Sequence, residues 1–242
     1  MRCGARIWLA ALAGLALCAP AAMAQRSDDL AARLDITLLM GEPQGEMDYL
    51  VNEGFGLQLG GAFPVAAEGH LLLRGDFGFM IYGHERQQFC YAAPVGCRIG
   101  LDMTTDNSIL FAGFGPEIVL ATGAVEPYVN VSVGVSYFVT TTSLGDDHGY
   151  DDYATTTNYD DAVFAWRAGG GVRVRVSNGR KPVYLDFAAE RHQNGVADYL
   201  TEGDILDHPD GSITLFPNRT EANLVTFRMG VSIGIPHRRG RH

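Results

Sequence analysis

Residues 125–139 read V-E-P-Y-V-N-V-S-V-G-V-S-Y-F-V, with apolar side chains at the odd positions and mostly polar or small side chains at the even positions. Successive side chains of a β-strand point to opposite faces, so this period of two predicts a strand whose two faces meet different surroundings. The stretch has 15 residues, whereas strands usually have about 5–6. It therefore predicts a long, two-sided strand.

The same alternation occurs in eight segments of the chain. Three connections between them are short turns, near residues 66–68, 122–123 and 178–179, and the other four are longer. Short turns at one end and long loops at the other are typical of an all-β, eight-stranded antiparallel up-and-down β-barrel with both termini at the short-turn end. The expected strands are residues 33–41, 53–65, 70–86, 107–121, 124–142, 161–176, 182–195 and 221–235.

One of the short turns also predicts a strand register. If Asn178-Gly179 is a two-residue hairpin turn, Val174 pairs with Val183 and apolar residues face apolar residues along both strands. Thr122-Gly123 is interpreted in the same way, which pairs Ile118 with Pro127.

The first 24 residues are predicted to be a cleaved signal peptide. Arg2 and Arg6 precede an apolar run over residues 7–17, which is followed by Ala22-Met23-Ala24, a small-residue cleavage pattern. The run is shorter than the roughly 20 residues of a spanning helix, which disfavours an uncleaved anchor. The expected organisation is a signal peptide (1–24), a short N-terminal segment (25–32), a barrel domain (33–236) and a basic periplasmic tail (237–242).

The charge balance argues against nucleic acid as a partner. Loss of the signal peptide removes two arginines and no acid, so the formal net charge falls from −10 to −12. Such a chain repels phosphate backbones.

The polar face of the segments decides which side faces the interior of the barrel. It interleaves charged residues with glycines, and the only lysine of the chain, Lys181, lies in a turn, whereas a solvated surface favours lysine. Eight strands enclose a lumen that side chains can fill, and buried charges must be paired. We therefore expect the apolar face to meet lipid, in preference to a lipocalin-like barrel with an apolar interior. The expected luminal ion-pair network comprises Arg33, Asp35, Arg74, Asp76, Glu117, Glu126, Arg167, Arg173, Arg175, Asp186, Glu190 and Arg228.

With these features, residues 33–235 resemble the small eight-stranded outer-membrane β-barrels of diderm bacteria, of the OmpA, OmpX and OmpW type. The last segment adds Arg228, Gly230, Ile233 and Ile235, which look like the signal that outer-membrane assembly machinery reads in this class. The strand ends at Ile235 and Pro236 where the family usually has a terminal aromatic residue. The resemblance implies an outer-membrane location, contact with membrane lipid and lipopolysaccharide, and a monomeric state.

Cys90 and Cys97 are the two cysteines that follow the signal peptide. In an exported chain, two cysteines seven residues apart around a proline and a glycine are expected to form a local disulfide. A metal pair is the alternative, but it needs more ligands than the nearby His84 supplies.

Two long connections, at residues 143–160 and 196–220, are rich in acids and are candidate sites for an extracellular ligand. Their oxygen ligands suit Ca²⁺ or Mg²⁺, but the spacing matches no EF-hand, so solvated acidic loops are expected. The acids are Asp146, Asp147, Asp151, Asp152, Asp160, Asp161, Glu202, Asp204, Asp207 and Asp210, with His148 among them.

The sequence predicts no catalytic, metal-ligating or cofactor-binding residues. The pairs Asp207-His208, with Ser212 nearby, and His84-Glu85 are adjacent in sequence, which does not make their side chains face each other. The predicted function is that of a non-enzymatic outer-membrane barrel with a structural role in the envelope or a role in surface interaction. A narrow, porin-like channel or a lateral conduit for small apolar molecules is the alternative, and a lipid-modifying enzyme is less favoured.

Overall fold

The computed structural model describes residues 30–66, 69–93, 96–146, 152–177, 179, 181–208 and 212–236. The predicted signal peptide, most of the segment after it and the basic tail lie outside these residues. In the described part of the chain, no helix is long and apolar enough to span a membrane.

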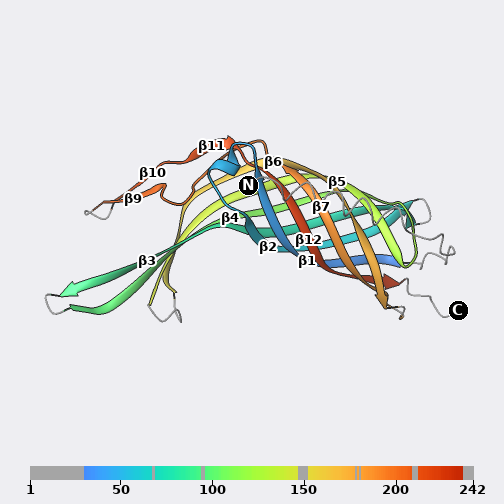
Figure 1. Cartoon of the computed structure of the whole chain (residues 1–242), viewed down its shortest axis with the longest axis horizontal. Coiled ribbons are helices and arrows are strands. Elements are labelled where there is room, and N and C mark those ends of the chain that lie inside the picture. The colour runs from blue at the N-terminus through green and yellow to red at the C-terminus, as the bar shows by residue number, and fades with distance from the viewer. Residues whose placement is uncertain are drawn as a thin grey trace, which may run out of the picture.

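Eight antiparallel strands form a closed barrel (Figure 1), which confirms the predicted fold. Each strand pairs with its neighbours in the chain, and the ring closes between the first and the last strand in the order β1-β12-β7-β6-β5-β4-β3-β2. The barrel strands are β1 (Leu30–Gln44), β2 (Gly54–Ala66), β3 (Leu71–Ala93), β4 (Gly96–Val119), β5 (Val125–Asp146), β6 (Asp152–Ser177), β7 (Val183–Gln193) and β12 (Asn223–Pro236).

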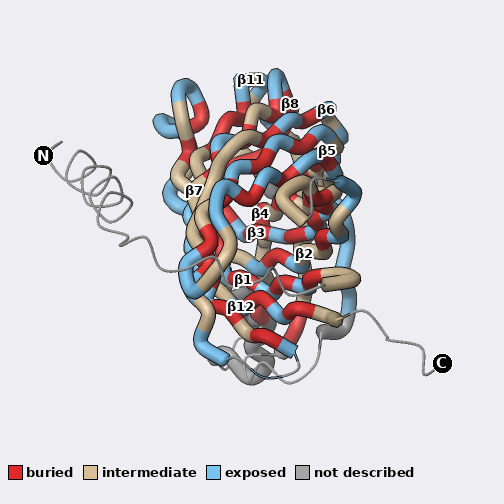
Figure 2. The backbone as a smooth tube through the Cα atoms, turned by 90° about the vertical axis from the view of Figure 1, so that its right-hand side faces the viewer, coloured by how far each residue is buried: buried red, intermediate tan, exposed pale blue. Residues whose placement is uncertain are grey.

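Alternation along the strands produces an apolar exterior and a polar interior. On β5, Val131 is 49% exposed while its neighbour Asn130 is 4% exposed. Buried and exposed residues alternate in this way along the wall of the barrel (Figure 2). The exposed rows on the other strands hold leucine, isoleucine, valine and phenylalanine, such as Ile36, Phe77 and Phe114.

The register predicted from the two-residue turns is wrong by two residues. Val174 pairs with Leu185, not with Val183, and Ile118 pairs with Val129, two residues beyond Pro127. The paired strands end before the turn residues, since β6 stops at Ser177 and β7 begins only after Pro182. Proline has no N–H to donate to a β-ladder, so the pairing does not continue toward the turn. A shift of two keeps every side chain on its face, so the predicted faces are unaffected.

Four strands continue beyond the barrel as an extended sheet (Figure 1). β3 pairs with β4 as far as Ala93 and Gly96, and β4 and β6 pair with β5 out to residues 144–146. The connection expected at residues 143–160 is therefore mostly β-hairpin, because its threonine-rich sequence suits strands.

The connection between β7 and β12 also contains strands. β8 (Val196–Tyr199) pairs with β11 (Asn218–Glu221), and β9 (Ile205–Asp207) pairs with β10 (Ile213–Leu215). A short 3-10 helix, η1 (Met47–Tyr49), lies between β1 and β2.

Candidate functional site

The lumen contains a network of buried charges centred on Glu117. This carboxylate accepts from Arg173 at 2.6 Å, from Arg74 at 3.1 Å and from Arg33 at 3.5 Å. Arg74 also donates to Asp35 at 2.7 Å and, through Nε, to Asp76 at 2.9 Å. The strands β1, β3, β4 and β6 are thus tied together across the lumen.

The network extends toward the short-turn end of the barrel. Glu126 accepts from Arg33 at 2.9 Å and forms an ion pair with Arg175 at 3.5 Å. Asp186 lies 3.6 Å from Arg173 and accepts from the Tyr128 hydroxyl at 2.8 Å. These contacts join β5 and β7 to the same cluster.

A second centre of the charged network forms around Glu190. It lies toward the mouth, which is the end of the barrel from which the extended sheet leaves. Arg228 forms an ion pair with Glu190 at 2.8 Å and Asn130 Nδ2 donates to Glu190 at 2.6 Å, while His192 lies 3.6 Å away. The structure therefore brings eleven of the twelve predicted luminal charges into ion pairs.

Arg167 is the twelfth, and it differs from the others. Its side chain is buried, but its guanidinium nitrogens have no hydrogen-bond partner among the described residues. The guanidinium lies over the ring of Phe111, 4.9 Å from the ring centre. It reaches across β5 to β4, where a Cβ at Gly113 would come within 2.0 Å of Nη2. Arg167 thus forms a boundary between the charged network and the aromatic residues above it.

Apolar side chains fill the lumen toward the mouth, where the sequence predicted only polar ones. Tyr82, Phe138 and Tyr199 pack as an aromatic trio, with ring centres between 5.7 and 6.4 Å apart. They belong to a buried cluster, here called the mouth plug, formed by Leu39, Met47, Met80, Tyr82, Ile109, Phe111, Phe138, Ala197, Tyr199, Ala222 and Leu224. Its sequence signal is a break in the alternation, as in F-M-I-Y at residues 79–82, where both faces become apolar.

The β7–β12 connection supplies the upper part of the mouth plug. Asn194 Nδ2 donates to the carbonyl of Ala222 at 2.6 Å, and Asn194 Oδ1 accepts from Ser136 on β5 at 2.8 Å. The Tyr82 hydroxyl donates to the carbonyl of Leu200 at 3.2 Å. Burial in the mouth plug raises the pKa of Tyr199, which lies beyond the outward-facing apolar rows of the barrel. The mouth of the barrel is therefore covered by the chain itself.

Some of the predicted loop acids have structural roles. Asp204 Oδ2 accepts from the Thr201 amide at 2.7 Å and from Asn218 Nδ2 at 2.5 Å. Asp161 accepts from the Asp198 amide at 2.8 Å. The cluster expected around residues 146–152 and the acid Asp210 have side chains outside the described part, and so has Asp207.

The histidines considered for catalysis contact other partners. His84 Nδ1 lies 2.6 Å from Asp106 on β4, and not against Glu85. His208 Nε2 lies 2.8 Å from Thr214 Oγ1, and its amide donates to the Ser212 carbonyl at 2.9 Å. Over the described residues, no group of three or more histidines, cysteines and acids is placed to hold a metal.

The predicted disulfide and assembly signal remain predictions. Cys90 and Cys97 lie near the tip of the β3–β4 hairpin, where the side chains are outside the described part. In the last strand, Arg228 faces the lumen and Ile233 faces outward, with 41% of its surface exposed.

No family model matches the chain, and no curated protein matches it. Solved structures that are similar over most of its length include the following three. Neisserial surface protein A is 13% identical and covers 86% of this chain and 97% of its own, with a TM-score of 0.47. Ail, the attachment invasion locus protein of Yersinia pestis, is 10% identical over 84% of this chain and 97% of its own, with a TM-score of 0.44. A major outer membrane protein from Thermus thermophilus is 13% identical over 85% of this chain and 100% of its own, with a TM-score of 0.41. The chain's own strand pairing establishes that it is an eight-stranded up-and-down β-barrel.

Proposed function

We propose that this chain is a non-enzymatic, monomeric outer-membrane barrel that acts outside the cell, through the sheet that extends from its mouth. The membrane placement rests on the exterior of the barrel. Large apolar side chains are exposed on all eight barrel strands, for example Leu38, Leu57 and Phe187. A contiguous apolar surface of this kind is rare on monomeric soluble proteins, and closed barrels can cross a bilayer because no strand edge is left unpaired.

A transport function is disfavoured by the filled lumen. The six arginines and six carboxylates of the network balance, and the mouth plug covers them on the outer side. An eight-stranded barrel has little space beyond its own side chains. The network is therefore suited to rigidity more than to conduction.

The observation that carries the proposal is the extended sheet. β2 pairs with β3 only as far as Ile81, so the following residues of β3 have no described partner strand on that side. β7 likewise pairs with β6 only as far as Trp166. Unpaired strand edges offer backbone groups to an incoming strand, which is a known mode of protein recognition.

The outer surface would favour a basic partner. The two arginines with described side chains beyond the mouth are already paired, Arg86 with Asp102 and Arg219 with Asp198. Exposed acids such as Glu53 and Glu202 have no ion-pair partner in the described part of the chain. The net potential outside the mouth is negative and would steer cationic groups toward it.

The proposal is tested by shortening the β3–β4 hairpin. His84 pairs with Asp106, so residues 85–105 can be replaced by an Asn-Gly turn without altering the barrel register. Bacteria displaying the intact or shortened chain are compared for adhesion to immobilised basic proteins, glycosaminoglycan and lipopolysaccharide. We expect the shortened chain to reach the surface in equal amount and to lose adhesion to basic proteins. Equal adhesion by the two chains would overturn the role of the hairpin.

A lateral conduit has one observation in its favour. On the lipid side, a hollow of about 590 Å³ lies over Gly61, Gly75 and Ala112, and luminal Asp76 contributes to its wall. Arg167 lies directly behind it, against Gly113. This candidate predicts that permeation of small apolar molecules into vesicles falls when Gly75 is replaced by phenylalanine.

A further inference from the structure

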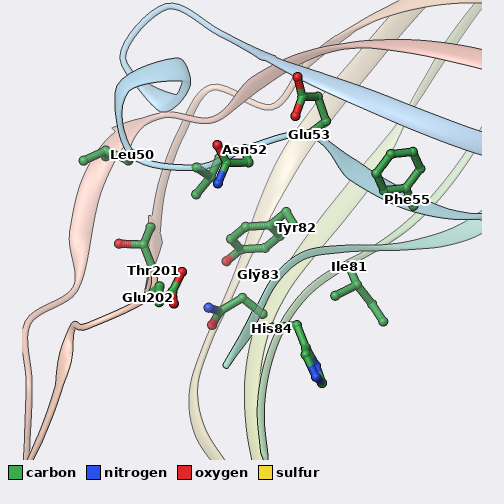
Figure 3. A pocket seen from close by; sticks show the side chains of 12 residues that line it. Leu50, Asn52, Glu53, Phe55, Ile81, Tyr82, Gly83, His84, Thr201 and Glu202 are labelled. Carbon is green, nitrogen blue, oxygen red and sulfur yellow. The ribbon is translucent and has the colours of Figure 1, made fainter. Parts of the chain in front are cut away.

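A cavity of about 430 Å³ lies at the outer rim of the barrel, beside the mouth plug. It is formed by the η1–β2 connection, the adjoining parts of β3 and β4, and the segment after β8 (Figure 3). Its volume is in the range of small-molecule sites. None of the functions considered above uses it.

One wall of this rim cavity is continuous with the lipid-facing surface. Phe55 and Ile81 pair across β2 and β3, and both point outward, with exposed fractions of 62% and 36%. They are the last members of the lipid-facing rows on their strands. A molecule in the cavity can therefore keep an apolar part against the lipid-facing surface.

Two acidic side chains give the lining of the cavity a negative charge. Glu53 precedes β2 and Glu202 follows β8, so the two carboxylates come from different elements (Figure 3). Both are exposed, and neither has an ion-pair partner among the described residues. The described residues that line the cavity include no lysine or arginine, and His84 is adjacent to Asp106.

A glycine keeps the inner part of the cavity open. A Cβ at Gly83 would lie 2.8 Å from Asn107 Nδ2, so the absence of a side chain leaves this amide facing the cavity. Tyr82 lines the cavity on the side nearest the mouth plug, and its hydroxyl donates to the carbonyl of Leu200. A rigid aromatic ring beside carboxylates is a favourable environment for an ammonium group.

We infer that the rim cavity binds a free cationic amphiphile, with its ammonium group between Glu53 and Glu202 and its apolar tail along Phe55 and Ile81. The carboxylates disfavour an anionic head. The site rests on the membrane placement proposed above, because the tail lies at the edge of the lipid-facing surface.

The test follows isoleucine methyl groups by NMR in the full-length mature chain, embedded in zwitterionic nanodiscs and titrated with dodecylammonium. Ile81 lines the cavity, whereas Ile233 is lipid-facing at the opposite end of the barrel and reports general partitioning. We expect a saturable shift of the Ile81 methyl and none of the Ile233 methyl. Dodecyl maltoside, with the same tail and no charge, should bind more weakly, and dodecyl sulfate more weakly still.

The matched variants are Glu53→Gln with Glu202→Gln, and Asp48→Asn as the control. Asp48 is exposed in the same connection but does not line the cavity. The double variant should weaken dodecylammonium binding about fivefold, as expected for two partly exposed ion pairs, while the control stays unchanged. All of these residues are exposed, so the variants should fold.

Three results would overturn the inference: an Ile81 shift that does not saturate, equal binding of the neutral amphiphile, or a double variant that binds like the control. The same sample tests the proposed membrane placement separately. If the barrel is not embedded in the bilayer, the Ile233 methyl would show no nuclear Overhauser contacts with lipid acyl chains.

Discussion

At the scale of single residues, position along a strand decides which environment a side chain meets. Val131 and Asn130 are neighbours in β5, yet one is half-exposed on the outer face and the other is buried beside Glu190. The alternation of residues 125–139 is sufficient to predict both placements. It cannot predict the partner of Asn130, because contacts across the lumen depend on register and on side-chain length.

Val131→Arg should destabilise the folded barrel by about 2–4 kcal/mol, because it places a charge in the hydrocarbon region. Thr141→Arg, further along β5 and beyond the lipid-facing rows, should change stability by no more than about 0.5 kcal/mol. Urea unfolding of both variants in lipid vesicles measures the difference. Equal stability of the two variants would refute the lipid-facing assignment.

Glu117→Gln should be among the most destabilising luminal changes. The carboxylate is fully buried and is shared by Arg33, Arg74 and Arg173, so its neutralisation leaves the balanced luminal network with one buried positive charge in excess. The expected loss is about 3–5 kcal/mol. The same unfolding measurement should show almost no change for Asp48→Asn at the surface. A loss for Glu117→Gln as small as that of the control would mean that the network does not stabilise the barrel.

At the scale of elements, all eight barrel strands are predictable from the sequence and their ends are not. Beyond the mouth, β3 to β6 carry polar residues on both faces, because they no longer separate a barrel interior from an exterior. The sequence therefore predicts loops where the extended hairpins lie. The register error at the short turns has a similar origin. Turn residues such as Asn-Gly fix a tight hairpin only when the flanking residues can pair, and Pro182 cannot donate to a ladder.

The mouth plug is predictable in principle but requires a different pattern. Leu39, Met80 and Phe111 occupy inward positions within short continuous apolar runs, which a search for alternation does not detect. Of the plug residues, Ala197 and Tyr199 belong to a connection with no alternation at all. Their burial follows only from the folding of β8 and β11 over the mouth.

Removal of residues 196–221, which form most of the β7–β12 connection, should leave a folded but less stable barrel. The Ala222 amide donates to the Gly195 carbonyl at 2.9 Å, so the ends of residues 196–221 are adjacent and can be joined by a short glycine linker. The deletion removes Ala197 and Tyr199 from the mouth plug and exposes apolar surface, which lowers the free energy of unfolding.

The deletion variant should still migrate as a folded, heat-modifiable barrel on gels, with a lower urea midpoint than the intact chain. A variant that does not fold would show that β8 and β11 are part of the barrel core. An unchanged midpoint would show that the mouth plug adds no stability.

At the scale of the whole molecule, the barrel is a closed cylinder with a polar sheet outside. Charged side chains fill the lumen, the mouth plug covers them, and β3 to β6 continue outward (Figure 1). In the proposed membrane placement, the rigidity of the cylinder gives the extended sheet a fixed base at the membrane surface. The acids of the sheet and of the rim cavity then define a negative outer surface.

Single-channel recording of the refolded chain in a planar bilayer tests the closed lumen most directly. The charged network and the mouth plug predict a membrane that stays electrically silent at moderate voltage. Discrete, reproducible openings whose size shifts when Arg167 or Glu190 is neutralised would contradict the account, because they would show that ions pass through the luminal network.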